Sequence, residues 1–242
     1  MARKAKAKTS LKSPLRGASP TPRHVLSAAA PYAEAVGAPP AHLTKPKKLS
    51  MWGNDVHGDC VTAEEAFAKA CHSPEIFIAS NVATDWAQRH GVLEGATLHE
   101  VLQWMRTDGF VEGAHTYDDG PFFAVDWTKA TVLMSAIAQG PVKIGVAADQ
   151  LETVWRAYRG KSGWIATGFK ADANEDHCVS LCGYGSIRWL AHQLKAKLPA
   201  GLNTSMPAYA LFTWDSIGII DAPSMLAITH EAWLRTPTTI VQ

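Results

Sequence analysis

The sequence predicts an α+β fold of two lobes, with helices gathered in its first half and β-strands in its second. Apolar residues at spacings of three and four predict a helix from Cys60 to about His72. After the turn residues 118–121 the composition changes to short β-rich segments. We therefore expect a helical lobe over about 49–117 and an antiparallel β lobe over about 118–242, with a cleft between them.

The expected elements can be placed in order along the chain. Ser80 opens one predicted helix, and Thr97 caps the next, which ends at Gly109. Two further helices are expected in the β lobe, TKATVLMSAIAQG and QLETVWRAYRG, and the predicted strands are FFAVDW, GPVKIGVAA, GWIATG, CVSLCGY and ALFTW. The chain of 242 residues, 47% of them hydrophobic, can bury a full core.

Residues 1–48 form a basic extension rich in Ala, Lys and Pro. Residues 1–50 hold ten Lys and Arg against one acid, which gives +9 and leaves −8 for the remainder of a chain whose net charge is +1. Proline at this density disfavours regular structure, which predicts a solvated or loosely draped extension. The alternative is a basic arm that binds nucleic acid or an acidic protein partner.

The cysteine content and the absence of long apolar runs bear on location. Four cysteines without a dense framework predict free thiols in a reducing compartment. The basic N-terminus is followed by no apolar signal segment, and no run approaches the roughly 20 apolar residues of a membrane span. We expect a cytoplasmic protein with no membrane association.

The stretch GNDVHGDC points to a reactive thiol at Cys60. A cysteine at the first turn of a helix, behind a glycine turn, has its thiolate stabilised by the helix amides and dipole, which predicts a lowered thiol pKa. Cysteine catalysis also needs an imidazole, which can lie far away in sequence. His177 opens a predicted strand after turn-forming acids, so its ring can project into a cleft.

These residues together resemble the papain superfamily of cysteine peptidases. Asn54 and Gly58 stand where the family has a glutamine six residues and a glycine two residues before its nucleophile. The stretches GPVKIGVAADQLETVWRAYRG and DHCVSLCGYG are similar to the family's GPV strand and its histidine strand. The resemblance spans roughly residues 50–235 and looks closest to the compact bacterial and phage branch.

The resemblance implies a papain-like two-lobed fold and roles for particular residues. Cys60 would be the nucleophile and His177 its base and acid, while the Asn54 amide and the Cys60 N–H would form the oxyanion hole. The family's asparagine-serine-tryptophan marker corresponds here to a segment that puts Phe212 at the asparagine position. Two alternatives follow: a Cys60–His177 dyad shielded by Trp214, or a triad completed by Asp215. Alternation along the strand favours the dyad.

The remaining signals predict structural roles. Cys178 and Cys182 are expected to be packing residues, and no residue spacing indicates a metal site or a cofactor. Residues 187–204 look like an insertion whose apolar face predicts a helix closing over the β lobe. The alternative for this insertion is a lid or a docking surface beside the cleft.

Two functional hypotheses follow from the sequence. The first is a cysteine peptidase or amide hydrolase that cleaves a peptide or protein substrate in the inter-lobe cleft through an acyl-enzyme. The second is a papain fold used as a structural or binding component of a phage or bacterial assembly, with an unused or degenerate site. Under this second hypothesis the chain would be a homo-oligomer or part of a larger, virion-associated assembly.

Overall fold

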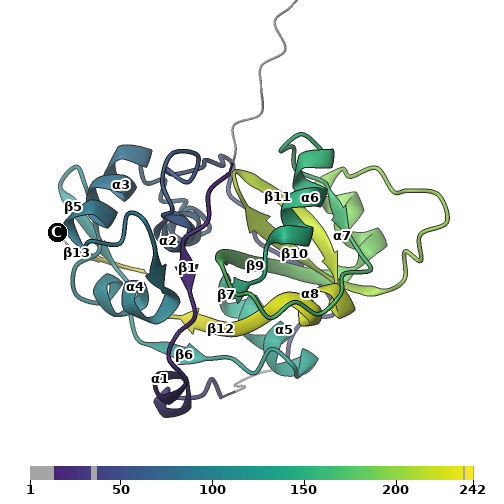
Figure 1. Ribbon diagram of the computed structural model, residues 1–242, viewed down its shortest axis with the longest axis horizontal. Helices are drawn as coiled ribbons and strands as arrows, with labels where there is room; N and C mark the ends of the chain where they lie inside the picture. Colours follow the sequence, from purple (N-terminus) through teal and green to yellow (C-terminus); the bar gives the residue numbers. More distant parts are fainter. Residues whose placement is uncertain (1–13, 34–36, 237, 242) are drawn as a thin grey trace, which may run out of the picture.

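The computed structural model describes residues 14–33, 37–236 and 238–241, and these form two lobes joined side by side (Figure 1). The helices are α1 (Arg23–Ala28), α2 (Cys60–Ala70), α3 (Ser80–Arg89), α4 (Leu98–Met105), α5 (Ala130–Gln139), α6 (Asp149–Ala157), α7 (Ile187–Leu194) and α8 (Ala222–Ile228). The strands are β1 (Ala18–Ser19), β2 (His42–Leu43), β3 (Ala96–Thr97), β4 (Phe110–Glu112), β5 (His115–Asp118), β6 (Phe122–Ala124), β7 (Val142–Val146), β8 (Ile165–Ala166), β9 (His177–Ser186), β10 (Pro207–Thr213), β11 (Ser216–Asp221), β12 (Thr229–Arg235) and β13 (Thr239–Val241).

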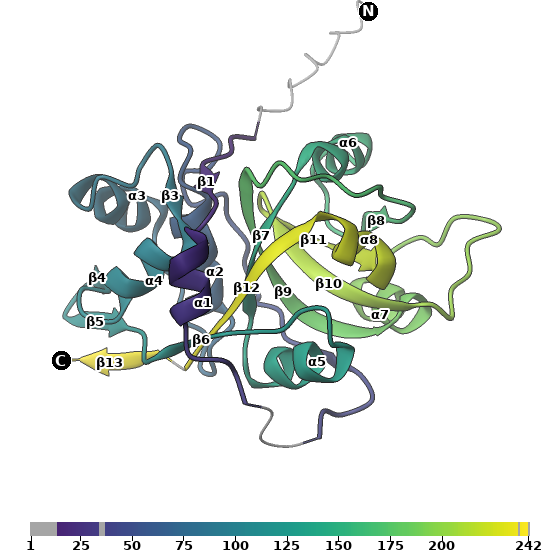
Figure 2. The ribbon, with the colours of Figure 1, turned by 60° about the horizontal axis from the view of Figure 1, so that its bottom comes forward.

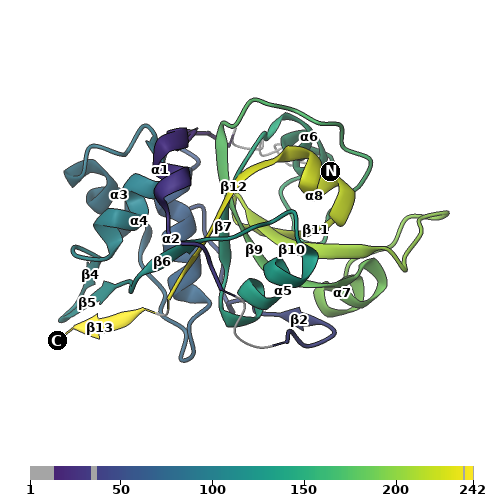
Figure 3. The ribbon, with the colours of Figure 1, turned by 90° about the horizontal axis from the view of Figure 1, so that it is seen from below.

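The helical lobe contains α2, α3 and α4, as the sequence predicts. Thr97 caps α4 in a reciprocal capping box with Glu100, which satisfies amides that the helix itself leaves unpaired. A small antiparallel sheet of β4, β5 and β13 borders this lobe, so the last strand of the chain returns from the β lobe (Figure 3).

The β lobe is built on one sheet with the strand order β6-β12-β7-β9-β10-β11-β8, to whose β9 the short β2 also pairs. Its pairs are antiparallel except for β11 with β8. Helix α7 packs against β10 and β11, as the apolar face of the insertion predicts, and α8 lies beside the same strands (Figure 3). The two lobes meet where α2 packs against β9.

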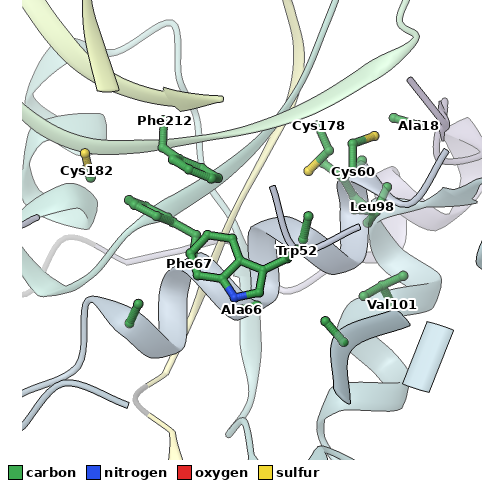
Figure 4. Close-up of a cluster of buried hydrophobic side chains, with 14 of the residues drawn as sticks. Ala18, Trp52, Cys60, Ala66, Phe67, Leu98, Val101, Cys178, Cys182 and Phe212 are labelled. Carbon is green, nitrogen blue, oxygen red and sulfur yellow. The ribbon is translucent and has the colours of Figure 1, made fainter. Parts of the chain in front are cut away.

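Aromatic packing fixes the position of α2 on the sheet. Phe67 of α2 stacks on Phe212 of β10 with ring centroids 3.9 Å apart, and Trp52 meets Phe212 edge-on (Figure 4). All three side chains are buried. Phe212 is therefore a packing residue on the side of the sheet that faces α2.

A group of buried charged side chains also joins α2 to the β lobe, with acids and bases in equal number. These are Glu64, Glu65, Lys69, Asp119, Lys143 and Arg235. Lys143 pairs with Glu65 and lies 3.3 Å from Glu64, and Arg235 donates to Glu64 at 2.8 Å. Each carboxylate thus has a cation beside it, as buried charges require.

The described part of the N-terminal extension is packed on the two lobes, which differs from the loose extension expected from its composition. Strand β1 pairs with β3, β2 pairs with β9, and the Tyr184 hydroxyl donates to the Pro39 carbonyl. Figures 1 and 2 show β1 and α1 running along the junction of the lobes. The lysine-rich start, residues 1–13, lies outside the described residues.

Two expectations about composition can be compared with the structure. Cys60, Cys71, Cys178 and Cys182 are free thiols, and Cys178 and Cys182 are buried in the core. Among the residues that the structure describes, no helix has the length and apolar character needed to cross a membrane.

Candidate active site

Cys60 is the first residue of α2 and lies at the junction of the lobes. Asp59 precedes it at the N-cap position, and the thiol is 2% exposed. Figure 4 shows its side chain next to Cys178 of β9 and Ala18 of β1. Cys60 thus stands at the first turn of a helix, as the GNDVHGDC stretch predicts, and its thiol faces β9.

The charge state of this thiol differs from the expectation of a lowered pKa. Burial raises the pKa of Cys60 to about 11, and backbone amides of Cys178, Gly17 and Ala18 offset part of that rise. Burial likewise lowers the pKa of His177 to about 3. Burial therefore favours the neutral form of both groups, and at Cys60 it outweighs the effect of the helix terminus.

His177 begins β9, and its ring is held from two sides. Trp214 stacks on the imidazole with centroids 4.4 Å apart and ring planes 18° apart. Nε2 lies 2.8 Å from the Thr213 hydroxyl oxygen. Nδ1 is buried and has no hydrogen-bond partner among the described residues. The ring is fixed through Nε2, which leaves Nδ1 as the nitrogen available to a reacting group.

The hairpin between β10 and β11 explains why Thr213 occupies this place. Thr213 pairs with Ser216 across a two-residue turn in which Trp214 and Asp215 have φ values of 43° and 61°. These positive values are typical of the tight turns that join antiparallel strands. Asp215 is exposed at the turn and makes no hydrogen bond to His177, so the triad through Asp215 is not formed in this structure.

Asn54 lies in the loop before α2 and is 3% exposed. Its side-chain amide donates to the His57 carbonyl at 3.1 Å. Burial raises the pKa of Asp59 to about 8, a rise that the Asn54 side chain partly opposes. In this state the Asn54 amide therefore supports its own loop.

The chain's own residues 14–21 lie across Cys60. The Leu15 amide donates to the Asn54 carbonyl, and the Trp214 indole donates to the Leu15 carbonyl at 3.1 Å. Gly17 accepts from the Ala96 amide at 2.9 Å. This segment, which we call the cover segment, leaves the candidate site closed to solvent.

Glycines make room for the cover segment. A Cβ atom on Gly17 would lie 1.6 Å from the Gly58 carbonyl oxygen, and one on Gly95 would lie 2.8 Å from the Gly17 oxygen. Gly95 also has a φ of 139°, in the range that favours glycine. The backbones at Gly17, Gly58 and Gly95 lie so close together that these positions leave no room for a side chain.

Arg16 anchors the cover segment to the β lobe. Its guanidinium lies 2.6 Å from Asp149, 2.5 Å from Glu152 and 2.6 Å from Asp176. Burial opposes the charge, but hydrogen bonds to these carboxylates raise the pKa of Arg16 further above its ordinary value. The acidic partner of this part of the basic extension is thus the chain's own β lobe.

Several solved cysteine proteases share this architecture. Xylellain from Xylella fastidiosa aligns with a TM-score of 0.64 over 96% of this chain and 99% of its own, at 12% identity. The fold is that of the papain-like cysteine proteases. The papain-like fold is also shared by the ragweed allergen Amb a 11 in its proform (TM-score 0.60, 11% identity, 88% of this chain and 72% of that chain). The Carica candamarcensis protease CMS1MS2 in complex with E-64 gives a TM-score of 0.57 at 15% identity over 82% of this chain and 99% of its own. No family model matches the chain, and the comparison with curated proteins gave no match.

Two features of the site were not reached from the sequence. Thr213 lies directly before Trp214, the residue at which the family marker aligns. A prediction of two strands joined by a two-residue turn at Trp214 and Asp215 would have placed Thr213 at the end of the first strand. The cover segment gives no periodic signal. A glycine beside a lone arginine, Arg16-Gly17, is its one unusual feature.

Proposed function

We propose that the chain is a papain-like cysteine peptidase or amide hydrolase in which Cys60 is the nucleophile and His177 its proton carrier. Thr213 would position the imidazole, and Asn54 with the Cys60 N–H would stabilise the oxyanion. Its substrates would be peptides or proteins that enter between the lobes. The structural neighbours Xylellain and Amb a 11, which are cysteine proteases, support this class of reaction.

The chemistry follows from the ring nitrogens. With the imidazole hydrogen on Nε2, donated to Thr213, the lone pair of Nδ1 can accept the thiol proton of Cys60. The sulfur then attacks the substrate carbonyl carbon, and a carbon–sulfur bond forms. The imidazolium returns the proton to the leaving amine as the carbon–nitrogen bond breaks, and water hydrolyses the thioester.

The cover segment would hold this site in a closed resting state. While it is docked, Cys60 and His177 are buried and neutral, and no substrate backbone can lie where residues 14–21 lie. When it leaves, water reaches both groups, the burial that raised the thiol pKa ends, and the start of α2 favours the thiolate.

The observation that carries the proposal is the arrangement of His177. Its ring is stacked on Trp214 and bonded at Nε2, while Nδ1 has no partner among the described residues, and the backbone of the next residue, Cys178, contacts the Cys60 thiol. A histidine with a purely structural role has no need of an unpaired buried nitrogen, which costs free energy.

The test compares Arg16→Glu with Arg23→Glu in the full chain. Arg23 is exposed on α1, so its change controls for charge alone. We expect iodoacetamide to label Cys60 faster in Arg16→Glu than in the wild type or the control, as measured by intact mass and peptide mapping. Hydrolysis of casein or a fluorogenic peptide should appear with it and be lost in Cys60→Ala and His177→Ala.

The alternative hypothesis, a structural or binding component of a phage or bacterial assembly, predicts a different result. Cys60 would become accessible in Arg16→Glu, but neither peptide nor protein substrates would be cleaved. A large symmetric particle in a solution mass measurement would then favour this alternative. The observation that favours this alternative is the burial of Cys60 and His177, which shifts the pKa of each group towards its neutral form.

A further inference from the structure

A pair of buried carboxylates lies beside the candidate site without a cation. Glu175 is 9% exposed and Glu231 1% exposed. Neither forms an ion pair with Lys or Arg within the described ranges, and Oε1 of Glu175 has no hydrogen-bond partner there. Glu231 accepts from the Trp233 indole at 2.5 Å and from the Thr21 amide at 3.1 Å. The structural acids of α2, such as Glu65, are matched by cations, whereas these two are not.

Glu175 and Glu231 lie along the course of the cover segment over the β lobe. Gly145 of β7 pairs with Cys178 of β9, whose backbone amide faces the Cys60 thiol. The cover segment crosses the thiol at Gly17 and reaches Glu231 at Thr21. At about 3.3 Å per extended residue, these two points, four residues apart, are at most about 13 Å from each other. A peptide in the same channel would therefore carry a side chain to the pair a few residues from the reacting bond.

Gly145 makes the space for the carboxylates. A Cβ atom there would lie 1.9 Å from Oε1 of Glu175 and 3.0 Å from Cγ of Glu231. A glycine inside a strand weakens the strand and often marks a close approach of another group. Here it lets the two acids Glu175 and Glu231 converge at β7.

Two buried carboxyl groups without a cation cost folding free energy, and a bound cation would offset that cost. Burial and the contact with Glu231 raise the pKa of Glu175 to about 9, so the pair retains a proton at neutral pH. Burial lowers the pKa of His99, an effect that the nearby Glu231 partly opposes. A guanidinium would release the retained proton and offer each carboxylate charge-assisted hydrogen bonds, because its planar fork matches carboxylates.

We propose that Glu175 and Glu231 form a specificity pocket that selects substrates with an arginine side chain. The proposal rests on the proposed peptidase function and names the substrate class of that site. Thr21 of the cover segment closes this pocket in the resting state by donating its backbone amide to Glu231.

The test measures binding, so it does not depend on catalysis. The full chain carrying Cys60→Ala and Arg16→Glu is titrated calorimetrically at pH 7 with acetylated pentaalanine amides that have one arginine at each position in turn. The same peptides with citrulline, a neutral isostere of arginine, are the comparison. Because residual docking of the cover segment competes equally with both peptides, the affinity ratio is unaffected by it.

We expect arginine to bind at least tenfold more tightly than citrulline at one position. The double change Glu175→Gln and Glu231→Gln should abolish that ratio, and Asp85→Asn, an exposed acid of α3, should preserve it. Should the double variant fail to fold by circular dichroism, Glu175→Gln alone should reduce the ratio.

Equal affinities at every position, no measurable arginine binding, or a ratio that survives the glutamine changes would each overturn the pocket. Failure of the proposed function gives a different pattern. The arginine preference would then persist while Cys60 in the Arg16→Glu chain hydrolyses no arginine-containing peptide.

Discussion

Gly17→Ala is the smallest change that should open the candidate site. The added Cβ atom would lie 1.6 Å from the Gly58 carbonyl oxygen, and a backbone atom of a neighbouring loop cannot move aside as a flexible side chain can. The cover segment must therefore shift away from the slot around Cys60. The rest of the site is untouched by the substitution.

The size of the effect can be worked out from the hydrogen bonds beside Gly17. The Ala96 amide donates to the Gly17 carbonyl at 2.9 Å, and the Ala18 amide donates to the Asp176 carbonyl at 3.3 Å. Each such bond contributes about 0.5–1.5 kcal/mol net, so losing both costs roughly 1–3 kcal/mol. Since 1.4 kcal/mol is a factor of ten, the undocked population should rise about 5- to 150-fold.

The assay is the rate at which iodoacetamide modifies Cys60 in the intact chain at pH 7.5, followed by mass spectrometry. This rate tracks the undocked population when docking is fast compared with alkylation. Gly37→Ala is the matched control, because a Cβ atom at Gly37 would meet nothing within 4 Å. Equal Cys60 labelling in Gly17→Ala, Gly37→Ala and the wild type would refute the idea that the cover segment protects the thiol.

Two further predictions concern the imidazole and the acidic pair. In the Arg16→Glu background, Thr213→Val should lower kcat about fivefold, the value of one hydrogen bond of about 1 kcal/mol, and leave KM nearly unchanged, because Nε2 of His177 loses its partner. Thr213→Ser should retain the rate, and an unchanged pH–rate profile in Thr213→Val would assign the positioning to the stacked tryptophan instead. Because Glu175 has a folded-state pKa of about 9 against its ordinary 4.5, the stability that its neutral form contributes is complete below pH 4.5 and is lost as the pH rises towards 9. The urea midpoint of the wild type, measured at pH 5, 7 and 9, should therefore fall with rising pH more than that of Glu175→Gln. The same pH dependence of the midpoint in both proteins would contradict this pKa.

Much of the fold could be predicted because its signals are local. The helix beginning at Cys60 and the helix capped by Thr97 follow from apolar spacing and capping chemistry, and the structure contains both. The strand beginning at His177 follows from its flanking turn residues and β-branched content, and it is β9. Such patterns depend on neighbours a few residues away, which the sequence displays directly.

The details of the site depend on residues distant in sequence. Thr213 meets His177 at the end of β10, where the turn at Trp214 and Asp215, two residues with positive φ, fixes the register of β10 against β11. A shift of one residue would have presented Phe212 instead. The motif resemblance places the tryptophan, but it does not determine which side chain meets the ring.

The docking of the cover segment could not be predicted either, because the residues that hold it are distant from it in sequence. Its slot is made by Gly58 and Gly95, and its anchor Arg16 binds two acids of α6 and Asp176, the residue directly before β9. This burial raises the pKa of the Cys60 thiol, whereas the helix terminus considered alone predicts a lowered pKa. A charge count along the chain cannot reveal which acids will surround one arginine.

The long reach of the cover segment has a consequence for how the protein is made. Leu15 is bonded to an indole 199 residues further along the chain, and Arg16 to a carboxylate 160 residues away. At a synthesis rate of about 5–20 residues per second, Leu15 waits roughly 10 to 40 s for its partner. His177 and Trp214, which complete the candidate site, leave the ribosome in the same late interval. The residues that complete the reactive centre and the partners that hold the cover segment over it therefore become available in the same interval of synthesis.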